Sequence, residues 1–208
     1  MSAALKDTFR EIDSKISYSV FKAYPKSSDC QLLLKSLEWS CHGVPFLSLT
    51  LAALYLWPQN ETVAKLLLGL IADIIYVALI KAFSRRRRPI YAKQDDQITI
   101  AMDKHSFPSG HASRAIYVAL FFNDQSFMSL LIWIWALSVC MSRIFLGRHF
   151  ITDVIGGILL GAFNHWFQFG IGQSLYKFFI WLLFNVLGVQ FSTRQDYDSE
   201  DTLLDDDS

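Results

Sequence analysis

TVAKLLLGLIADIIYVALIKAF, residues 62–83, is a largely apolar stretch with only isolated charged residues inside it. Its length matches the roughly 20 residues that an α-helix needs to cross the hydrocarbon core of a bilayer. Similar apolar runs lie on both sides of it, at residues 42–57, 112–122, 127–141, 151–169 and 171–189. These runs predict an all-α protein, a polytopic transmembrane helical bundle of about six spans.

The composition of the 208-residue chain agrees with a bilayer protein, because 52% of the residues are hydrophobic and only 18% are charged. The length leaves room for one functional unit. We divide it into an N-terminal cytosolic or interfacial segment (1–41), a transmembrane domain (42–191) and an acidic, disordered tail (192–208). The formal net charge is zero. Nucleic acid is not expected as a partner, and no residue pattern specifies an oligomeric state.

The N-terminal segment carries its own helical pattern. Residues 5–24 place five apolar side chains at helical spacing with charged residues between them: Leu5, Phe9, Ile12, Ile16 and Val20. Such a pattern is typical of an amphipathic helix that lies in the membrane interface. Packing of the same face on the protein's own helices is the alternative.

Lysine and arginine residues are concentrated on one side of the predicted topology. If the spans alternate in direction, that side receives residues 1–41, 81–111 and 141–150, which hold most of the basic residues. The opposite turns, at 58–61 and 123–126, contain none. Because translocation of Lys and Arg is disfavoured, we expect both termini and the long loops to be cytosolic.

Three polar clusters lie on this same side, each where a span meets a loop. The first is Lys81 followed, after six residues, by Arg88-Pro89. Fixed cations at the membrane surface suit anionic oxygens, and Arg88 can bind two of them at once. Residues 85–88 are all arginine, and for Arg85 to Arg87 we favour a simple positive-inside anchor.

The second cluster is Ser106-Phe107-Pro108-Ser109-Gly110-His111, which precedes an apolar run. A loop that enters a helix here would expose backbone N–H groups, which form an anion site. Ser109 can cap the helix and donate to a phosphate oxygen, and His111 can act as an acid. Pro-Ser-Gly is also ordinary turn chemistry, so this cluster gains meaning only beside the others.

The third cluster is Ser142-Arg143, then His149, then Asp153. The i, i+4 separation of His149 and Asp153 places both on one face at the start of a helix. The carboxylate can then hold one imidazole nitrogen and leave the other free to attack. A structural histidine is the alternative for His149, but a carboxylate and two arginines accompany it.

Together, Lys81-x6-Arg88-Pro89, Pro108-Ser109-Gly110-His111 and Ser142-Arg143-x5-His149-x3-Asp153 resemble the three motifs of the type 2 phosphatidic acid phosphatase superfamily. Within it, the small size, the arginine run and the residues around His149 are most similar to the polyisoprenoid diphosphate/phosphate phosphohydrolases, also called presqualene diphosphate phosphatases. The resemblance implies an all-helical fold and phosphatase activity.

The resemblance also implies roles for the individual residues. His149 would attack phosphorus, Asp153 would orient it, and His111 would protonate the leaving oxygen, with a phosphohistidine as the intermediate. The remaining residues would bind the phosphoryl oxygens: Lys81, Arg88, Ser109, Gly110 and Arg143. Because cations and donors surround the phosphate, no cofactor and no metal, including Mg²⁺, should be needed, and vanadate should inhibit.

A site at the bilayer surface is most accessible to an amphiphile whose tail stays in the lipid. Isoprenoid diphosphates and monophosphates such as the presqualene, farnesyl and geranylgeranyl compounds fit, and phosphatidic, lysophosphatidic or sphingoid phosphates fit almost as well. A non-enzymatic membrane scaffold and a vanadium haloperoxidase are the less favoured alternatives. On family resemblance the expected location is the endoplasmic reticulum, with the nuclear envelope as a second site. For Asp73, inside residues 62–83, we expect a structural hydrogen bond between helices.

Overall fold

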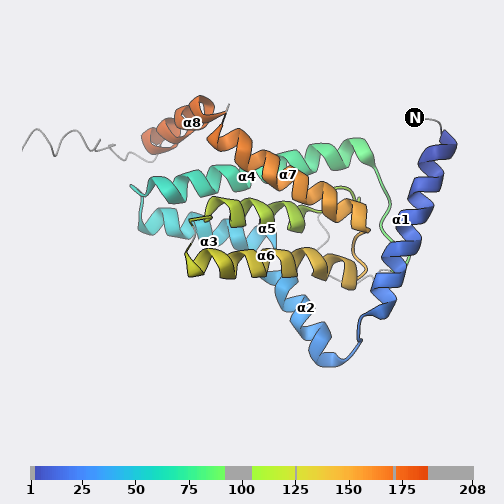
Figure 1. The fold of residues 1–208 in the computed structure, drawn as a ribbon. Coiled ribbons are helices and arrows are strands. Elements are labelled where there is room, and N and C mark those ends of the chain that lie inside the picture. Colours follow the sequence, from blue (N-terminus) through green and yellow to red (C-terminus); the bar gives the residue numbers. More distant parts are fainter. Residues whose placement is uncertain (1–2, 92–104, 125, 171, 187–208) are drawn as a thin grey trace, which may run out of the picture.

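The computed structural model describes residues 3–91, 105–124, 126–170 and 172–186. Within these ranges the elements are all helices (Figure 1), which confirms the all-α prediction. Their bounds are α1 (Ala3–Ala23), α2 (Ser28–Ser40), α3 (Gly43–Leu56), α4 (Glu61–Ser84), α5 (Gly110–Phe121), α6 (Phe127–Phe145), α7 (Ile151–Phe169) and α8 (Gln173–Val186). The acidic tail, predicted to be disordered, lies outside the described residues.

Local chemistry explains where several helices begin. The side chain of Asn60 accepts a hydrogen bond from the Val63 amide at 3.1 Å at the start of α4. Ser126 caps α6 in the same way. Each cap satisfies one of the backbone N–H groups that a helix start leaves without an intrahelical partner. Helices α4 and α6 therefore start at polar residues that separate the apolar runs.

The number of membrane crossings is less simple than the apolar runs suggest. Among the described residues, α4 and α6 are each long and apolar enough to cross a membrane. The pairs α2–α3, bent by 48°, and α7–α8 pass the same test only as joined units, which gives two to four candidate spans. Helix α5 has 12 residues, which is too short to cross a core that needs about 20. The count of about six spans therefore stays a prediction.

Helix α5 is the centre of the bundle, between α4, α6 and α7 (Figure 1). Its close approach to α7 depends on two glycines. A Cβ atom on Gly157 would lie 2.4 Å from the Ser109 carbonyl oxygen, and one on Gly161 would lie 2.2 Å from the Ser113 carbonyl oxygen. Small residues one turn apart let helix backbones pack this closely in membrane proteins. The loop before α5 is thereby brought against the start of α7.

A buried polar cluster ties α4 to α5. Ser113 donates a hydrogen bond to Asp73, and Arg114 lies 3.5 Å from the same carboxylate. The Arg114 guanidinium also donates to the Cys41 carbonyl oxygen at 2.9 Å. The predicted role of Asp73 as a structural link between helices is confirmed.

One end of the bundle collects the three sequence clusters. Helices α4 and α6 end there, and α5 and α7 begin there; we call it the motif end (Figure 1). Helix α1 lies across the motif end and contacts α6 and α7. At the motif end, α1 buries the side chains of Asp13 and Ser17. The apolar side chains of Leu5, Phe9 and Ile12 are more than half exposed. The apolar side chains from Leu5 to Ile16 therefore do not pack on the bundle, whereas Val20, at the end of the same row, packs against its core.

Candidate active site

The motif end brings together the residues of all three clusters. Lys81 is buried in the last turn of α4, and Arg143 is buried in the last turn of α6. His111 lies in the first turn of α5, and His149 is buried in the loop between α6 and α7. The predicted convergence of the clusters at one site is therefore present in the fold.

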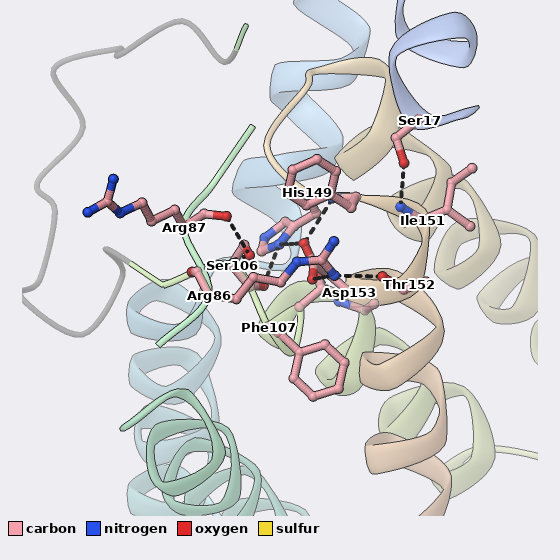
Figure 2. Close-up of polar contacts among 12 residues, drawn as sticks. Ser17, Arg86, Arg87, Ser106, Phe107, His149, Ile151, Thr152 and Asp153 are labelled. Carbon is pink, nitrogen blue, oxygen red and sulfur yellow. Dashed lines mark hydrogen bonds and ion pairs between the residues drawn. The ribbon is translucent and has the colours of Figure 1, made fainter. Parts of the chain in front are cut away.

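His149 is fixed through one ring nitrogen. Its Nδ1 atom lies 2.8 Å from the carbonyl oxygen of Ser106 (Figure 2). A carbonyl oxygen only accepts hydrogen bonds, so Nδ1 carries the hydrogen and Nε2 keeps its lone pair. The turn before it needs Gly147, whose φ of 69° favours glycine. This arrangement leaves the Nε2 lone pair without a hydrogen and available for reaction.

Asp153 lies beside the same imidazole, in the first turn of α7. Its Oδ2 atom is 3.8 Å from His149 Nδ1, longer than a hydrogen bond, and accepts one from the Phe150 amide at 2.9 Å. The predicted proximity of His149 and Asp153 is present, but the hydrogen bond of the imidazole goes to Ser106. At the 3.8 Å separation, Asp153 can act on a positive charge that develops on the ring.

The surroundings keep His149 neutral. Burial lowers its pKa to about 4, against the usual 6.5, and the positive charges of Arg143 and Arg88 contribute in the same direction. An imidazole with this pKa is unprotonated at pH 7, which is the form that can attack an electrophile. The same two arginines would attract an anionic substrate to the imidazole.

The start of α5 is held against this centre. The Ser109 amide donates to the Asp153 carbonyl oxygen at 2.9 Å, and the Ser109 hydroxyl accepts from the Ala112 amide at 3.5 Å. The predicted capping role of Ser109 is confirmed. Gly110 is the first residue of α5, so its N–H group lies among the donors at the helix start that favour an anion. The His111 ring packs edge-on near His42, with centroids 6.0 Å apart.

Two charged residues, one basic and one acidic, bind predicted site residues, although neither contact was predicted from the sequence. Arg86, interpreted above as a membrane anchor, instead donates to Asp153 Oδ1 at 2.8 Å (Figure 2). Glu38 of α2 is 2% exposed and accepts from Arg143 Nη1 at 2.8 Å. Glu38 lies far from the motifs in the sequence, so no pattern predicts its contact with Arg143. Arg86 is one of four adjacent arginines, and only its place between Lys81 and Arg88 could have indicated that it lies at the site.

Several polar atoms at the site are buried without a hydrogen-bond partner. They include Arg143 Nε, His111 Nε2 and Glu38 Oε2. Buried polar groups are almost always satisfied, so a bound anion or water would complete the hydrogen bonding of these atoms. Within the described ranges, no group of three or more His, Cys, Asp or Glu side chains could hold a metal ion.

The arrangement defines a class of protein. A neutral, oriented imidazole, a second imidazole, a nearby carboxylate and a set of cations are groups that can bind a phosphoryl group and catalyse its transfer. They stand at the end of a helical bundle that contains membrane-spanning helices. The site and fold are those of a membrane-embedded phosphoryl-transfer enzyme.

The family follows from comparison with known proteins. A family model described as the PAP2 superfamily matches residues 62–177, more than half of the chain. The chain therefore belongs to the PAP2 superfamily, and the resemblance stated from the motifs is confirmed. It is an integral membrane phosphatase, and thus a hydrolase.

Two similar proteins from different organisms are named as phosphatases. The chain is 31% identical over 179 residues to probable lipid phosphate phosphatase beta of Arabidopsis thaliana, which covers 72% of this chain and 84% of that protein. It is 32% identical over 133 residues to lipid A 4'-phosphatase of Porphyromonas gingivalis, which covers 60% of this chain and 53% of that protein.

Solved structures share the fold. A PAP2-type phosphatidylglycerolphosphate phosphatase from Bacillus subtilis superimposes with a TM-score of 0.63 and 21% identity, over 83% of this chain and 88% of that chain. Aquifex aeolicus LpxE gives a TM-score of 0.57 and 20% identity, over 73% of this chain and 90% of that chain. At these identities the likeness concerns the fold alone.

Proposed function

We propose that this phosphatase hydrolyses isoprenoid diphosphates and monophosphates, without a metal and through a phosphohistidine on His149. The observation that supports the mechanism is the neutral, buried imidazole of His149. Its Nδ1 atom is hydrogen-bonded to the Ser106 carbonyl oxygen, so Nε2 is available to attack phosphorus. The membrane setting supports an amphiphilic substrate whose tail stays in lipid. The names of the relatives, which include lipid phosphate and lipid A phosphatases, support a lipid-like phosphate.

The reaction has two steps. His149 Nε2 forms a bond to the terminal phosphorus while the bond from phosphorus to the bridging oxygen breaks, and His111 gives its proton to that oxygen. Burial and the charges of Arg143 and Arg114 lower the pKa of His111 in the free enzyme, so this step requires that the anionic substrate raise it and bind with His111 protonated. Water then attacks the phosphohistidine, His111 takes a proton from the water, and the N–P bond breaks to release phosphate. A diphosphate thus yields a monophosphate, which can bind again and yield the alcohol.

Electrostatic stabilisation comes from the protein in both steps. The phosphoryl oxygens are held by Lys81, Arg88, Arg143, Ser109 and the Gly110 N–H group. Fixed donors and cations aimed at a transferring phosphoryl group supply the stabilisation that Mg²⁺ supplies in other enzymes. The charge that His149 gains when it is phosphorylated is offset by Asp153.

The proposal includes the orientation of the protein in the membrane, with α1 in the interface and the site on the cytosolic side. The exposed apolar row of α1 supports a helix that lies in the interface, beside the motif end. The one-sided distribution of Lys and Arg supports a cytosolic site and cytosolic termini in a bundle of about six spans. Isoprenoid diphosphates that are made at the cytosolic face of the endoplasmic reticulum would reach such a site directly, and the nuclear envelope is continuous with that membrane.

The test is phosphate release by purified full-length protein in detergent with EDTA present. Farnesyl and presqualene diphosphate are compared with phosphatidic acid, and His149→Ala is measured beside the wild type. Release that persists in EDTA, prefers the isoprenoid diphosphates and disappears in the variant supports the proposal. A preference for phosphatidic acid favours the alternative, a glycerolipid or sphingoid phosphate phosphatase. No release from folded wild type contradicts both readings.

A further inference from the structure

We propose that α1 is part of the active site and that Asp13 and Arg86 are positioning residues for phosphoryl transfer. Asp13 lies outside residues 62–177, the part of the chain that the family model matches. Arg86 lies inside it but is none of the residues of the three motifs. The inference rests on the proposed function, because it assigns these residues an effect on the His149 reaction.

Arg86 connects α1 to the catalytic carboxylate. Its Nη2 atom donates to Asp13 Oδ2 at 2.6 Å, and its Nη1 atom donates to Asp153 Oδ1 at 2.8 Å. The guanidinium lies over the Phe150 ring, 4.3 Å from the centroid. Asp13 is 6% exposed and Asp153 is fully buried. A guanidinium held by two buried carboxylates and one aromatic face has a single available orientation.

Helix α1 also caps the helix that carries Asp153. The N-cap residue of α7 is Phe150, which has no hydroxyl or carboxylate to accept from the first-turn amides. Ser17 Oγ accepts from the Ile151 amide at 2.9 Å (Figure 2). Asp13 Oδ1 accepts from the Thr152 amide at 3.3 Å. Two of the first-turn amides that have no partner inside the helix are thus satisfied from α1.

These contacts fix Asp153 from both oxygens. Arg86 binds Oδ1, and the Phe150 amide binds Oδ2. The three ionic groups Asp13, Arg86 and Asp153 carry a net charge of minus one when ionised. Removing the charge of Asp13 would leave Arg86 to neutralise Asp153 alone, and the carboxylate would then stabilise a positive phosphohistidine less well. Substrate binding by Arg143 and Lys81 would not change.

The test uses full-length protein in detergent with farnesyl diphosphate. Asp13→Asn and Arg86→Lys are compared with Glu11→Gln, which removes a charge from the exposed face of α1, where Glu11 pairs with Lys15 at 2.7 Å. We expect kcat to fall by about tenfold to a hundredfold in the first two variants, as for partners that orient a catalytic group. KM should stay within about twofold, and Glu11→Gln should match the wild type.

A second variant separates positioning from folding. Ser17→Ala removes a cap between α1 and α7 and the 3.4 Å hydrogen bond from Ser17 to Asp13, but it keeps all three ionic groups and both contacts of Arg86. It should therefore lower the unfolding temperature and reduce kcat less than Asp13→Asn does. The inference is overturned if Asp13→Asn keeps the wild-type kcat, or if kcat in the two variants falls in proportion to stability. The proposed function fails separately, through a His149→Ala variant that still releases phosphate.

Discussion

His149 Nδ1 lies 2.8 Å from the Ser106 carbonyl oxygen and 3.8 Å from Asp153 Oδ2. The backbone of the second motif segment therefore sets the tautomer of the third motif's histidine. Because Ser106 contributes a carbonyl group, its own side chain is not needed for this contact. The orientation of the His149 ring depends on the position of the loop before α5, which the packing of α5 on α7 maintains.

The pH dependence of kcat/KM should reflect the buried imidazole. Burial lowers the pKa of His149 to about 4, so the neutral, reactive form persists as the pH falls and is lost only as the pH passes through about 4. We expect the acid limb of the profile well below the value of about 6.5 for a free imidazole. An acid limb at pH 6.5 or above would contradict this assignment of the nucleophile, provided that the limb remains when each of the other histidines is replaced.

Glu38 should stabilise the free enzyme by holding Arg143. In Glu38→Gln the buried guanidinium loses its anion, and breaking a buried pair typically costs about 3–5 kcal/mol. The thermal unfolding temperature should fall, and orthovanadate, which supplies an anion to Arg143, should restore it more than it raises that of the wild type. The matched control is Glu61→Gln, because Glu61 pairs with Lys65 at a partly exposed position. Equal unfolding temperatures for wild type and Glu38→Gln would refute this role.

Gly161 should tolerate no side chain. A Cβ atom there would lie 2.2 Å from the Ser113 carbonyl oxygen, so α5 must move away from α7 in Gly161→Ala. Overpacking of this kind typically costs about 1–3 kcal/mol. Faster thermal inactivation is expected, together with lower kcat, since the start of α5 carries His111. Leu159→Ala, at an exposed position on the same helix, is the control and should behave like the wild type.

Orthovanadate should inhibit competitively, because a trigonal-bipyramidal vanadate resembles the transition state in which the phosphoryl group passes between the leaving oxygen and His149. Inhibition should weaken at least about tenfold in Arg143→Ala, which removes a charge-assisted contact worth roughly 1.5–3 kcal/mol. Activity should be the same in EDTA and in added Mg²⁺. Full loss of activity in EDTA, restored by a divalent cation, would refute the metal-independent mechanism.

Much of the site could be predicted because its residues lie at fixed spacings within short motifs. The short separation of His149 and Asp153 in the chain predicts their proximity, although His149 lies in the loop before α7 and not, as expected, on the same helix face as Asp153. The alternation of apolar runs places all three motifs at one end of the bundle. The resemblance to the family supplied the roles. Ser109 as a cap and Asp73 as a link between helices were also predicted from local chemistry and are confirmed.

The remaining parts depend on contacts that no local pattern encodes. Asp13 and Glu38 meet their arginines only after α1 and α2 fold onto the motif end. Arg86 could not be distinguished from Arg85 and Arg87, since burial and not residue type separates them: Arg86 is half-buried and its neighbours are exposed.

The most direct test of the account is to identify the phosphorylated residue during turnover. Full-length protein is mixed with farnesyl diphosphate labelled on its terminal phosphate, quenched in alkali, which preserves phosphohistidine, and analysed by peptide mass spectrometry. The account predicts the label on His149 and its absence in His149→Ala. Label on another residue, or rapid turnover with no labelled protein at any time, would contradict it.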